Sequence, residues 1–565
     1  MKVPTPPITA ADIATGSQEG FRETLESIVI ALILAFVFRA FIVEAFVIPT
    51  GSMAPTLYGA HGTILCEDCG VEFAYGLMAP DETRRIVPVR YSSTAVCPNC
   101  NHLNTHLEAN DKRRNPENGD RILVFKWPLY LGGRLIGPDR WDVVVFKDPA
   151  DGDTNFIKRL VGLPEEVLMI ADGDVYSVAT SELSDKALAE LEALRHEKYL
   201  LRSGQRSGRL RAVSSDVLAE LDSKMVIRRK SRTARQALAF RVYDHDYAPR
   251  TRDRNQPTWS ARLGDDSGWK TPGHRLTFED RGRRSDYVQL EGKEIRATCR
   301  YNIHSRPAPP VSDLRVSFVL TPADARSTVQ IRLTKAGKTL WATVRADGLV
   351  TLAVSDDPPT ERTPPIASTR LPPLTPGKPV EVSFENIDYS LAIHVGGDEV
   401  LTSSDDRSSP AYYGPDLAAL RRGRSGGLCH PRIYGAAGAF SLDHLLVERD
   451  EHYYLDASAR ALNLPWAPRG GWAGMNTPIL LRKDEYFMLG DNTAASKDSR
   501  LWDQVGPHLT DRGEGFQLGT VPADQLIGKA FFVYWPSGQP LSWLPIPRLN
   551  EIGIIPDVGR MRWIR

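Results

Sequence analysis

One long apolar segment near the N-terminus constrains this chain more than any other sequence feature. Residues 28–38 are all apolar, and the run resumes after Arg39 as far as Ile48, broken only by Glu44. A helix needs about 20 such residues to cross a bilayer. Residues 28–48 supply them if the two charged side chains lie near an interface and reach water. We therefore predict a transmembrane anchor over 28–48, with the rest of the chain in water.

A cleaved signal peptide is the alternative for this segment, because its apolar region has a similar length. Such a leader begins with a basic stretch, whereas residues 1–27 hold Lys2 and Arg22 against four acidic residues. This balance favours an uncleaved anchor preceded by a tail over 1–27. It gives no orientation, since that inference needs a clear excess of basic residues on one side.

The composition is that of an ordinary globular protein. The 565 residues are 42% hydrophobic and carry 70 Lys+Arg against 70 Asp+Glu. These values exclude wholesale disorder and a protein with many membrane spans, and the length predicts several domains. Zero net charge argues against a nucleic-acid partner, whose phosphates require an excess of basic side chains.

Alternating apolar and polar residues predict a mainly β fold. Strand-like runs cover 121–127, 141–148, 155–163 and 165–178, the last with a hairpin at Asp172-Gly173. Residues 181–225 switch to a helical pattern. From about 230 to 450, short alternating runs separated by Pro, Gly and Asp turns predict a β-sandwich.

Three segments carry residues suited to catalysis. Ser52 lies in the Pro-Thr-Gly-Ser-Met turn after the apolar segment, where the alternative is an ordinary turn serine. Lys158 shares the strand 155–163 with Arg159; both could be cations of an edge strand that reach solvent. If Lys158 is buried, its pKa falls and it can act as a neutral base. The loop 490–500, GDNTAASKDSR, combines residues that hydrogen-bond one another and brace a site.

Four blocks in this order resemble the type I signal peptidases, membrane-anchored Ser/Lys endopeptidases of the peptidase S26 family that remove signal peptides from exported proteins. The blocks are 38–57, 118–127, 140–164 and 486–502. The resemblance implies a β-rich catalytic domain over 49–178 and 451–565, on the extracytoplasmic side of the cell (inner) membrane, and a cytoplasmic tail. The implied partners are the lipid bilayer and signal peptides with small residues at −1 and −3.

The same resemblance assigns the catalytic roles, and it implies no cofactor for catalysis. Ser52 is the expected nucleophile and Lys158 its general base, since a desolvated lysine can activate a serine without histidine or aspartate. Thr50 Oγ and the Ser52 N–H are expected to form the oxyanion hole. Ser496 is expected to orient the lysine.

Further residues follow from the resemblance. The expected bracing residues are Asp498, Arg500 and Arg159. The residues expected to line shallow substrate pockets, or else to be ordinary core, are Phe46, Ile48, Met53, Leu57, Val145, Phe156, Ile157 and Met488. Three positions depart from the family pattern: Trp141 and Glu165 replace usual glycines, and 493–495 replaces Arg-Asp-Asn, which would loosen the loop that holds Ser496.

Two insertions interrupt this domain. Within 58–118, Cys66, Cys69, Cys97 and Cys100 form two CxxC pairs with the spacing of a zinc ribbon, so we expect a structural zinc, with disulfides as the alternative. The second insertion, 179–450, combines the helical segment with the β-sandwich. Its strands resemble concanavalin A-like domains, which suggests a glycan or protein ligand, although fold does not imply function. Cys299 and Cys429 lie within it, either paired or buried as free thiols.

Three other functions compete with the signal peptidase hypothesis. An inactive anchored binding protein would use the sandwich and keep the protease core as a scaffold, but a scaffold needs neither Ser52 nor Lys158. A repressor-type Ser/Lys autoprotease would need a DNA-binding head in place of an anchor. A stand-alone lectin leaves the four ordered blocks unexplained.

Overall fold

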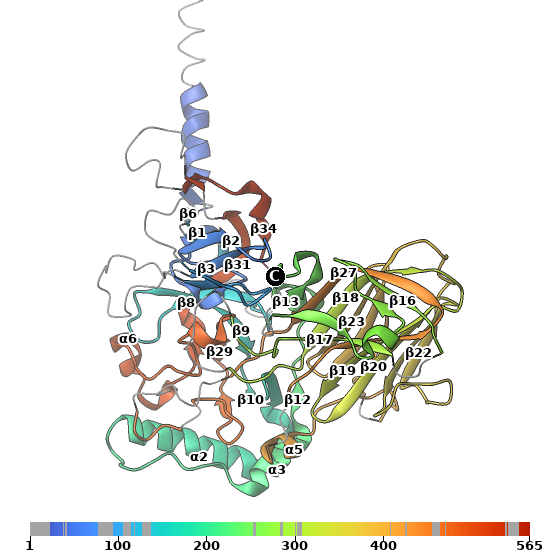
Figure 1. Ribbon diagram of the computed structural model, residues 1–565. Helices are drawn as coiled ribbons and strands as arrows, with labels where there is room; N and C mark the ends of the chain where they lie inside the picture. Colours follow the sequence, from blue (N-terminus) through green and yellow to red (C-terminus); the bar gives the residue numbers. More distant parts are fainter. Residues whose placement is uncertain are drawn as a thin grey trace, which may run out of the picture.

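The computed structural model describes residues 23–564 apart from 35, 38, 40–41, 77–93, 106–114, 118, 127–136, 252–255, 283–285, 300, 302–307, 407, 424–426, 455–463, 469–470, 537–538 and 541–552. The described chain is mainly β, as predicted, and builds several antiparallel sheets. In Figure 1 the sheets of the two ends of the chain lie on the left, and a β-sandwich lies on the right.

The predicted anchor is a helix only in its first part. Residues 23–34 are helical and project from the body of the protein (Figure 1), with exposed side chains such as Ile33 and Leu34. No helix among the described residues is long and apolar enough to cross a membrane. Residues 43–47, which we predicted to lie within the anchor, instead form strand β1, because they pair with β7 and the Glu44 carboxylate meets Lys126 Nζ at 2.8 Å.

The first sheet carries the predicted catalytic strand. Its order is β1-β7-β31-β8-β9-β29-β30, with β34 beside β31. These strands are β1 (Val43–Val47), β7 (Arg121–Lys126), β31 (Leu526–Trp535), β8 (Val143–Lys147), β9 (Asn155–Gly162), β29 (Glu485–Leu489), β30 (Val521–Pro522) and β34 (Arg562–Trp563). The sheet therefore joins segments from both ends of the chain, and the sandwich lies between them in sequence.

A second, four-stranded sheet joins this domain to the insert. Its order is β12 (Val226–Ile227), β11 (Asp174–Ala179), β10 (Glu166–Ala171) and β28 (Ile479–Leu481). The predicted hairpin between β10 and β11 is confirmed, and Asp172 and Gly173 have the positive φ values that a tight hairpin turn requires. The predicted helical segment is also confirmed as α2 (Asp185–Arg202) and α3 (Ser215–Lys224), each capped by a serine side chain.

Helix α2 packs on the C-terminal part of the chain. Its Arg195 guanidinium makes a buried bidentate ion pair with Glu485, at 2.6 and 2.7 Å. Lys198 Nζ donates to the Leu518 carbonyl at 2.5 Å. The helical segment, which we predicted as part of the insert, therefore packs against the C-terminal part of the chain.

The predicted β-sandwich is confirmed by two sheets that share one core cluster. One contains β15 (Trp269–Lys270), β16 (Leu276–Glu279), β27 (Ala439–Arg449), β18 (Leu314–Pro322), β23 (Val380–Ile387), β24 (Ser390–Val395), β25 (Asp398–Thr402) and, beside β27, β13 (Phe240–Asp244). The other contains β14 (Thr258–Ala261), β17 (Tyr287–Glu291), β26 (Arg432–Ala437), β19 (Thr328–Lys335), β20 (Lys338–Arg345), β21 (Leu349–Val354) and β22 (Ala367–Arg370). Short helices α4 (Arg232–Ala237) and α5 (Leu417–Arg421) flank them, and α6 (Pro507–Thr510) lies near the C-terminus.

Apolar and ionic contacts hold the sandwich against the second sheet. The sandwich core continues into Val167 and Met169 of β10. Beside it, Lys335 Nζ lies 2.5 Å from Asp313 and 3.1 Å from Asp174, and Lys230 Nζ lies 2.6 Å from both Asp388 and Asp450. Asp174, Asp313 and Asp388 are close enough together to hold a cation, but the ammonium groups of Lys335 and Lys230 already lie against them. We interpret this cluster as a structural joint.

The cysteine-bearing insertion forms a small module of its own. Strands β3 (Glu72–Gly76), β2 (His61–Leu65) and β6 (Asn115–Glu117) make a three-stranded sheet, and β4 (Ala95–Val96) pairs with β5 (Leu103–Asn104). A last pair joins β32 (Gln539–Pro540) to β33 (Gly553–Ile555).

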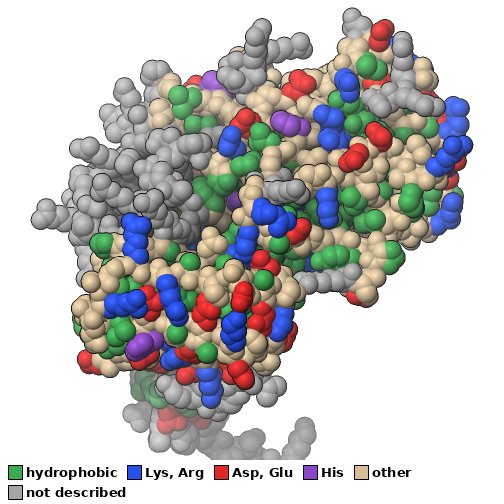
Figure 2. Space-filling view, turned by 90° about the horizontal axis from the view of Figure 1, so that it is seen from below, with side chains coloured by type: hydrophobic (Ala, Val, Ile, Leu, Met, Phe, Trp, Pro, Cys, Tyr) green, Lys and Arg blue, Asp and Glu red, His purple; other side chains and the backbone are tan. Residues whose placement is uncertain are grey.

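On the face seen in Figure 2, basic and acidic side chains are interspersed.

Candidate active site

The structure brings Ser52 and Lys158 together, although 105 residues separate them in the chain. Lys158 Nζ donates to Ser52 Oγ at 2.7 Å and to the Ile157 carbonyl at 3.1 Å. Both side chains are buried, at 5% exposure for Lys158 and 7% for Ser52. A serine hydroxyl in contact with a desolvated amine is the arrangement that a Ser/Lys mechanism requires.

Burial gives Lys158 the properties of a base. Lys158 and Arg159 are only 5% and 0% exposed, so the alternative of cations that reach solvent from an edge strand is wrong. Burial lowers the pKa of Lys158 to about 8, against smaller opposing effects of Asp498, Asp491 and Asp148. An amine with this pKa is substantially neutral near pH 8 and can accept the proton of a hydroxyl.

The turn that carries Ser52 is held by the loop that follows β29. Ser52 lies in the short 3-10 helix η1 (Gly51–Met53). Thr50 precedes this helix in an extended backbone conformation, and its side chain makes no capping hydrogen bond to the helix. Asn492 donates its backbone N–H to the Ser52 carbonyl and its side-chain amide to the Gly51 carbonyl, both at 3.0 Å. A Cβ at Gly490 would lie only 2.7 Å from the Ser52 carbonyl, so glycine is needed for this close approach.

Ser496 lies near the pair without the expected hydrogen bond. A Cβ at Gly490 would lie 2.2 Å from Ser496 Oγ and 2.7 Å from the Ser52 carbonyl oxygen. The Ser496 hydroxyl therefore packs against Gly490, the residue that also approaches Ser52. Its Oγ is buried and has no hydrogen-bond partner among the described residues. A buried hydroxyl of this kind retains its capacity to donate or accept, and its role in orienting Lys158 stays a prediction.

Two buried arginine–aspartate pairs brace the site. Arg159 donates from Nε and Nη2 to the Asp491 carboxylate at 2.8 and 2.7 Å. Arg500 donates in the same way to Asp498, at 2.8 and 2.6 Å, and Asp498 also accepts from the Gly490 N–H at 3.0 Å. The expected bracing residues therefore do meet around the loop, and Asp491 is a member that the sequence analysis missed.

The departure at 493–495 does not loosen this loop. The Thr493 hydroxyl donates to the Glu451 carboxylate in a short buried hydrogen bond. Glu451 also faces Arg449 at 3.4 Å, and burial raises the pKa of Glu451. The loop thus has an anchor at the end of the sandwich, and Glu451 is a second residue that no sequence signal identified.

At the other two departures from the family pattern, Trp141 and Glu165, the backbone has the positive φ that glycine adopts easily. Trp141 has φ of +78° and Glu165 has φ of +62°, in the left-handed region that bulky residues rarely occupy. The Trp141 carbonyl accepts from Arg159 Nη1 at 2.6 Å, and its indole Nε1 donates to the Arg229 carbonyl at 3.0 Å. The tryptophan therefore connects the bracing network to the insert, which a glycine could not do.

Most of the expected pocket residues lie together beside the pair. One core cluster contains Ile48, Met53, Leu57, Val145 and Ile157, with Phe46 partly buried against it. Met488 and Phe156 belong to a neighbouring cluster, although the Phe156 ring centroid lies 5.4 Å from Lys158 Nζ.

One side of β9 is only partly paired beside the Ser52–Lys158 pair. Strand β29 pairs with β9 only as far as Arg159. Phe156–Lys158 therefore have no strand partner on that side within the described part of the chain. An exposed sheet edge can accept a peptide as an added strand.

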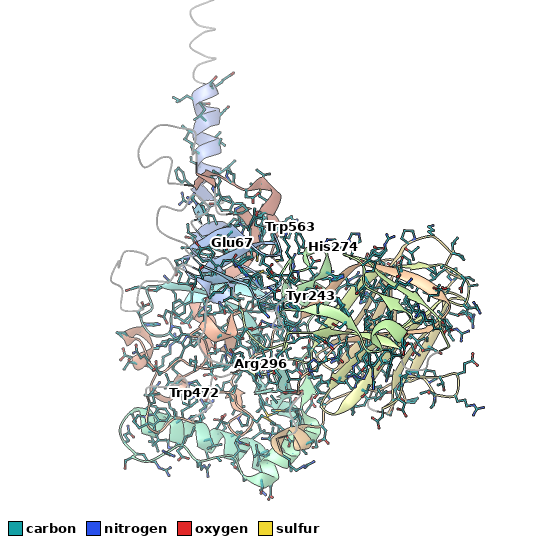
Figure 3. All side chains as sticks on the ribbon, viewed as in Figure 1. Glu67, Tyr243, His274, Arg296, Trp472 and Trp563 are labelled. Carbon is teal, nitrogen blue, oxygen red and sulfur yellow. The ribbon has the colours of Figure 1, made fainter. Side chains whose placement is uncertain are left out.

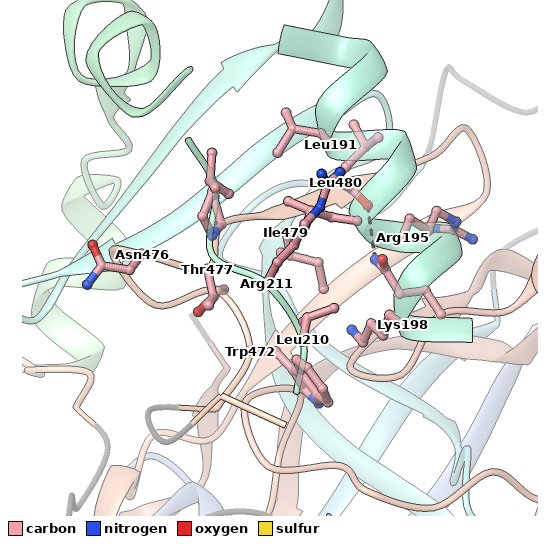
Figure 4. Close-up of a pocket in the computed structure, with 15 residues that line it drawn as sticks. Leu191, Arg195, Lys198, Leu210, Arg211, Trp472, Asn476, Thr477, Ile479 and Leu480 are labelled. Carbon is pink, nitrogen blue, oxygen red and sulfur yellow. Dashed lines mark hydrogen bonds between the residues drawn. The ribbon is translucent and has the colours of Figure 1, made fainter. Parts of the chain in front are cut away.

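The pocket in Figure 4 is a different feature. It lies between α2 and residues 472–480, encloses about 40 Å³ and has neither Ser52 nor Lys158 in its lining. That volume holds only a few water molecules. Lys198 lies in it with Nζ 3.7 Å from the Trp472 ring centroid, and we interpret it as a packing joint.

The four cysteines of the CxxC pairs converge as a metal site would require. Cys66 Sγ lies 3.5 Å from Cys100 Sγ, and Cys69 Sγ lies 3.6 Å from Cys97 Sγ. All four ligand atoms are buried and lie within 4.8 Å of one another. A tetrahedral zinc site with Zn–S bonds of about 2.3 Å has sulfurs about 3.8 Å apart, so these residues fit a structural metal ion. None of the six cysteines, Cys299 and Cys429 included, forms a disulfide.

We expect purified protein to contain about one zinc ion per chain, as this thiolate set predicts. Elemental analysis measures it, and thiol titration before and after chelation should expose four additional thiols. Cys100→Ser should abolish the zinc content, whereas Cys429→Ser, which removes a buried thiol outside the module, should retain it. Protein without zinc and without titratable thiols in the module would establish disulfides instead.

Removal of Arg159 should destabilise the protein severely, because Asp491 would be left as an unpaired buried charge. We expect Arg159→Leu to lower the free energy of unfolding by about 3–5 kcal/mol, measured by urea denaturation. Lys186→Ala breaks an ion pair with Asp216 whose side chains are 70% and 74% exposed, and it should have no measurable effect. Equal stabilities of the two variants would contradict this assignment.

Comparisons with known proteins agree with the resemblance. A sequence model of the family described as "Signal peptidase, peptidase S26" matches residues 21–207 and 453–535, on both sides of the sandwich. Signal peptidase I of Rickettsia bellii is 27% identical over 155 residues, which are 27% of this chain and 37% of that protein. Signal peptidase I of Pseudomonas fluorescens is 27% identical over 157 residues, 28% of this chain and 37% of that protein. The matched segments thus span about a third of the length of these relatives.

Among solved structures, the chain is similar to a carbohydrate-binding module, CBM66, of Bacillus subtilis, with 12% identity, a TM-score of 0.23, and coverage of 34% of this chain and 94% of the module. It is also similar to the carbohydrate recognition domain of Emp46p, with 11% identity, a TM-score of 0.23, and coverage of 35% of this chain and 92% of that domain. TM-scores this low carry no argument about the ligand of the insert.

Proposed function

We propose that this chain, a member of the peptidase S26 signal peptidase family whose domain is split around a large insert, is an endopeptidase that removes signal peptides from exported preproteins. The observation that carries the proposal is the 2.7 Å contact between Lys158 Nζ and Ser52 Oγ, which both side chains make while buried. Family membership supplies the substrate class.

In the proposed mechanism, neutral Lys158 removes the proton from Ser52 Oγ, which attacks the carbonyl carbon of the scissile peptide bond. The tetrahedral intermediate places its negative oxygen near Thr50 Oγ and the Ser52 N–H, which donate to it. The protonated lysine then gives its proton to the leaving amine, and the acyl-enzyme forms. A water molecule, deprotonated by the same lysine, hydrolyses the acyl-enzyme and regenerates the serine.

The surroundings of the pair support an extended substrate with small side chains. The open edge of β9 at Phe156–Lys158 would pair with the peptide backbone near the cleavage site. Ile48, Val145 and Ile157 belong to the adjacent apolar cluster, and in this proposal they contact the side chains of the substrate. We expect these contacts to select small residues at −1 and −3.

We further propose that the enzyme acts at a membrane, with the sheets on the extracytoplasmic side. Helical residues reach Arg39, a few residues before β1, and β1 is followed directly by the turn that carries Ser52. This short connection would keep the active site within reach of substrates at the bilayer surface. The lipid bilayer is thus the proposed second partner of the chain.

Cleavage of a preprotein with alanine at −1 and −3, in detergent micelles, tests the proposal. Wild type should release the mature protein with its N-terminus at the expected junction. Ser52→Ala and Lys158→Met should each lower kcat/KM by at least about a thousandfold, since both groups act as one unit. Lys147→Ala, which removes a lysine from the neighbouring strand β8, should retain activity.

Two results would contradict this function. Cleavage that survives both substitutions would exclude the Ser52–Lys158 pair as the catalytic residues. No cleavage by the wild type, with the fold intact, would favour the alternative of an inactive anchored protein that binds glycan or protein through its sandwich.

A further inference from the structure

Tyr301, a residue of the insert, packs directly on the turn that carries Ser52. A Cβ added at Gly51 would lie 2.2 Å from Tyr301 Cε1 and 2.9 Å from its Cδ1. The ring thus fills the space that any side chain at position 51 would need, and it is itself only 6% exposed. The insert therefore contacts the residue that immediately precedes the proposed nucleophile.

Tyr301 is fixed from several directions. Its hydroxyl donates to the Ala60 carbonyl at 3.2 Å, and its own carbonyl accepts from the Gly76 N–H at 2.5 Å. Its ring stacks on Tyr58, with centroids 5.6 Å apart and planes at 27°. Ala60 in turn donates its N–H to Pro49 at 3.4 Å. Ala60 therefore hydrogen-bonds with both Tyr301 and the turn 49–53.

The first CxxC knuckle binds the insert through Asp68. This side chain lies between Cys66 and Cys69 and is 4% exposed. Its Oδ1 accepts from the backbone N–H groups of Arg250 and Thr251 at 3.2 and 2.9 Å, and its Oδ2 accepts from Gln256 Nε2 at 2.8 Å. Figure 3 labels the neighbouring knuckle residue, Glu67.

The second knuckle does the same through Asn99, which is fully buried between Cys97 and Cys100. Asn99 Oδ1 accepts from the Asp244 N–H at 2.6 Å, and Nδ2 donates to the Tyr247 carbonyl at 2.7 Å. Lys293 Nζ donates to the carbonyls of Pro98 and Val242, at 2.6 and 2.5 Å. The buried inner residue of each knuckle thus hydrogen-bonds with the insert.

We propose that Tyr301 is a positioning residue for the Ser52 turn and that the four-cysteine module clamps the insert so that Tyr301 stays in place. This inference rests on the proposed function, because it assigns the insert a part in the same reaction. Without the ring, the turn gains room, and Ser52 Oγ spends less time within hydrogen-bond distance of Lys158 Nζ. A metal ion bound by the four cysteines would hold the two knuckles in the geometry that presents Asp68 and Asn99.

Kinetics of Tyr301 variants separate positioning from substrate binding. Tyr301 belongs to a cluster with Ala54, Phe240 and Cys299 and not to the predicted substrate pocket. Tyr301→Ala should therefore lower kcat by about tenfold to a hundredfold with KM nearly unchanged, because misplacement of reacting groups acts on the chemical step. Tyr301→Phe keeps the ring and should retain nearly all of kcat. Equal activity of Tyr301→Ala and wild type would overturn the proposal.

A double-mutant cycle tests the contact itself. Gly51→Ala should impair the wild type strongly, because the new methyl group collides with the tyrosine ring. In the Tyr301→Ala background the same substitution meets an empty space, so its additional effect on kcat should be smaller. Effects that multiply independently would show that the two positions are not coupled and would overturn the proposal.

Hydrogen exchange supplies a readout that needs no cleavage. Amides of residues 48–60 should exchange faster in Tyr301→Ala and in chelator-treated wild type than in zinc-loaded wild type, while those of α2 stay unchanged. If the wild type cleaves no preprotein, the proposed function fails, and this exchange still measures the clamp. Identical exchange over 48–60 in all three forms would overturn the clamp, whatever the activity.

Discussion

The contact between Ser52 and a dehydrated lysine is the interaction on which the rest of the site depends. An amine buried in β9 loses hydration, and this loss favours its neutral form. Three carboxylates near it, those of Asp498, Asp491 and Asp148, act in the opposite direction. Two of them are each committed to an arginine, Arg500 and Arg159. The arginine pairs thus limit how far the carboxylates stabilise the ammonium, and the pKa of Lys158 stays near 8.

The same network extends from the lysine to the insert. The Trp141 carbonyl receives Arg159, while the Trp141 indole reaches Arg229 on the other side. A left-handed tryptophan costs about 1–2 kcal/mol relative to a relaxed backbone, and its contacts with the insert offset that cost. Thr493 donates to Glu451, which faces Arg449 of the insert, and Tyr301 of the insert packs on the turn of Ser52. The insert is therefore a packed part of the catalytic domain and not a separate module on a linker.

The sequence allowed the dyad and much of its bracing to be predicted, because those residues lie in short blocks whose order is specific. It also predicted the β-sandwich, the two helices and the cysteine cluster, whose patterns are local. It did not predict Asp491, Asn492 or Glu451 as partners, since each acts through a contact with a residue more than 40 positions away. The strand at 43–47 was missed because its apolar residues continue the preceding helix pattern, and only pairing with β7 distinguishes them.

The pH dependence of kcat/KM for preprotein cleavage tests the central claim most directly. Only the neutral form of Lys158 can accept the Ser52 proton, so the rate must fall as pH drops below the pKa of the free enzyme. Since burial sets that pKa at about 8, we predict a tenfold loss per pH unit below about 8 and a plateau above it. An acid limb near 6.5, the ordinary pKa of histidine, or a profile that is flat between pH 6 and 9, would contradict a lysine base.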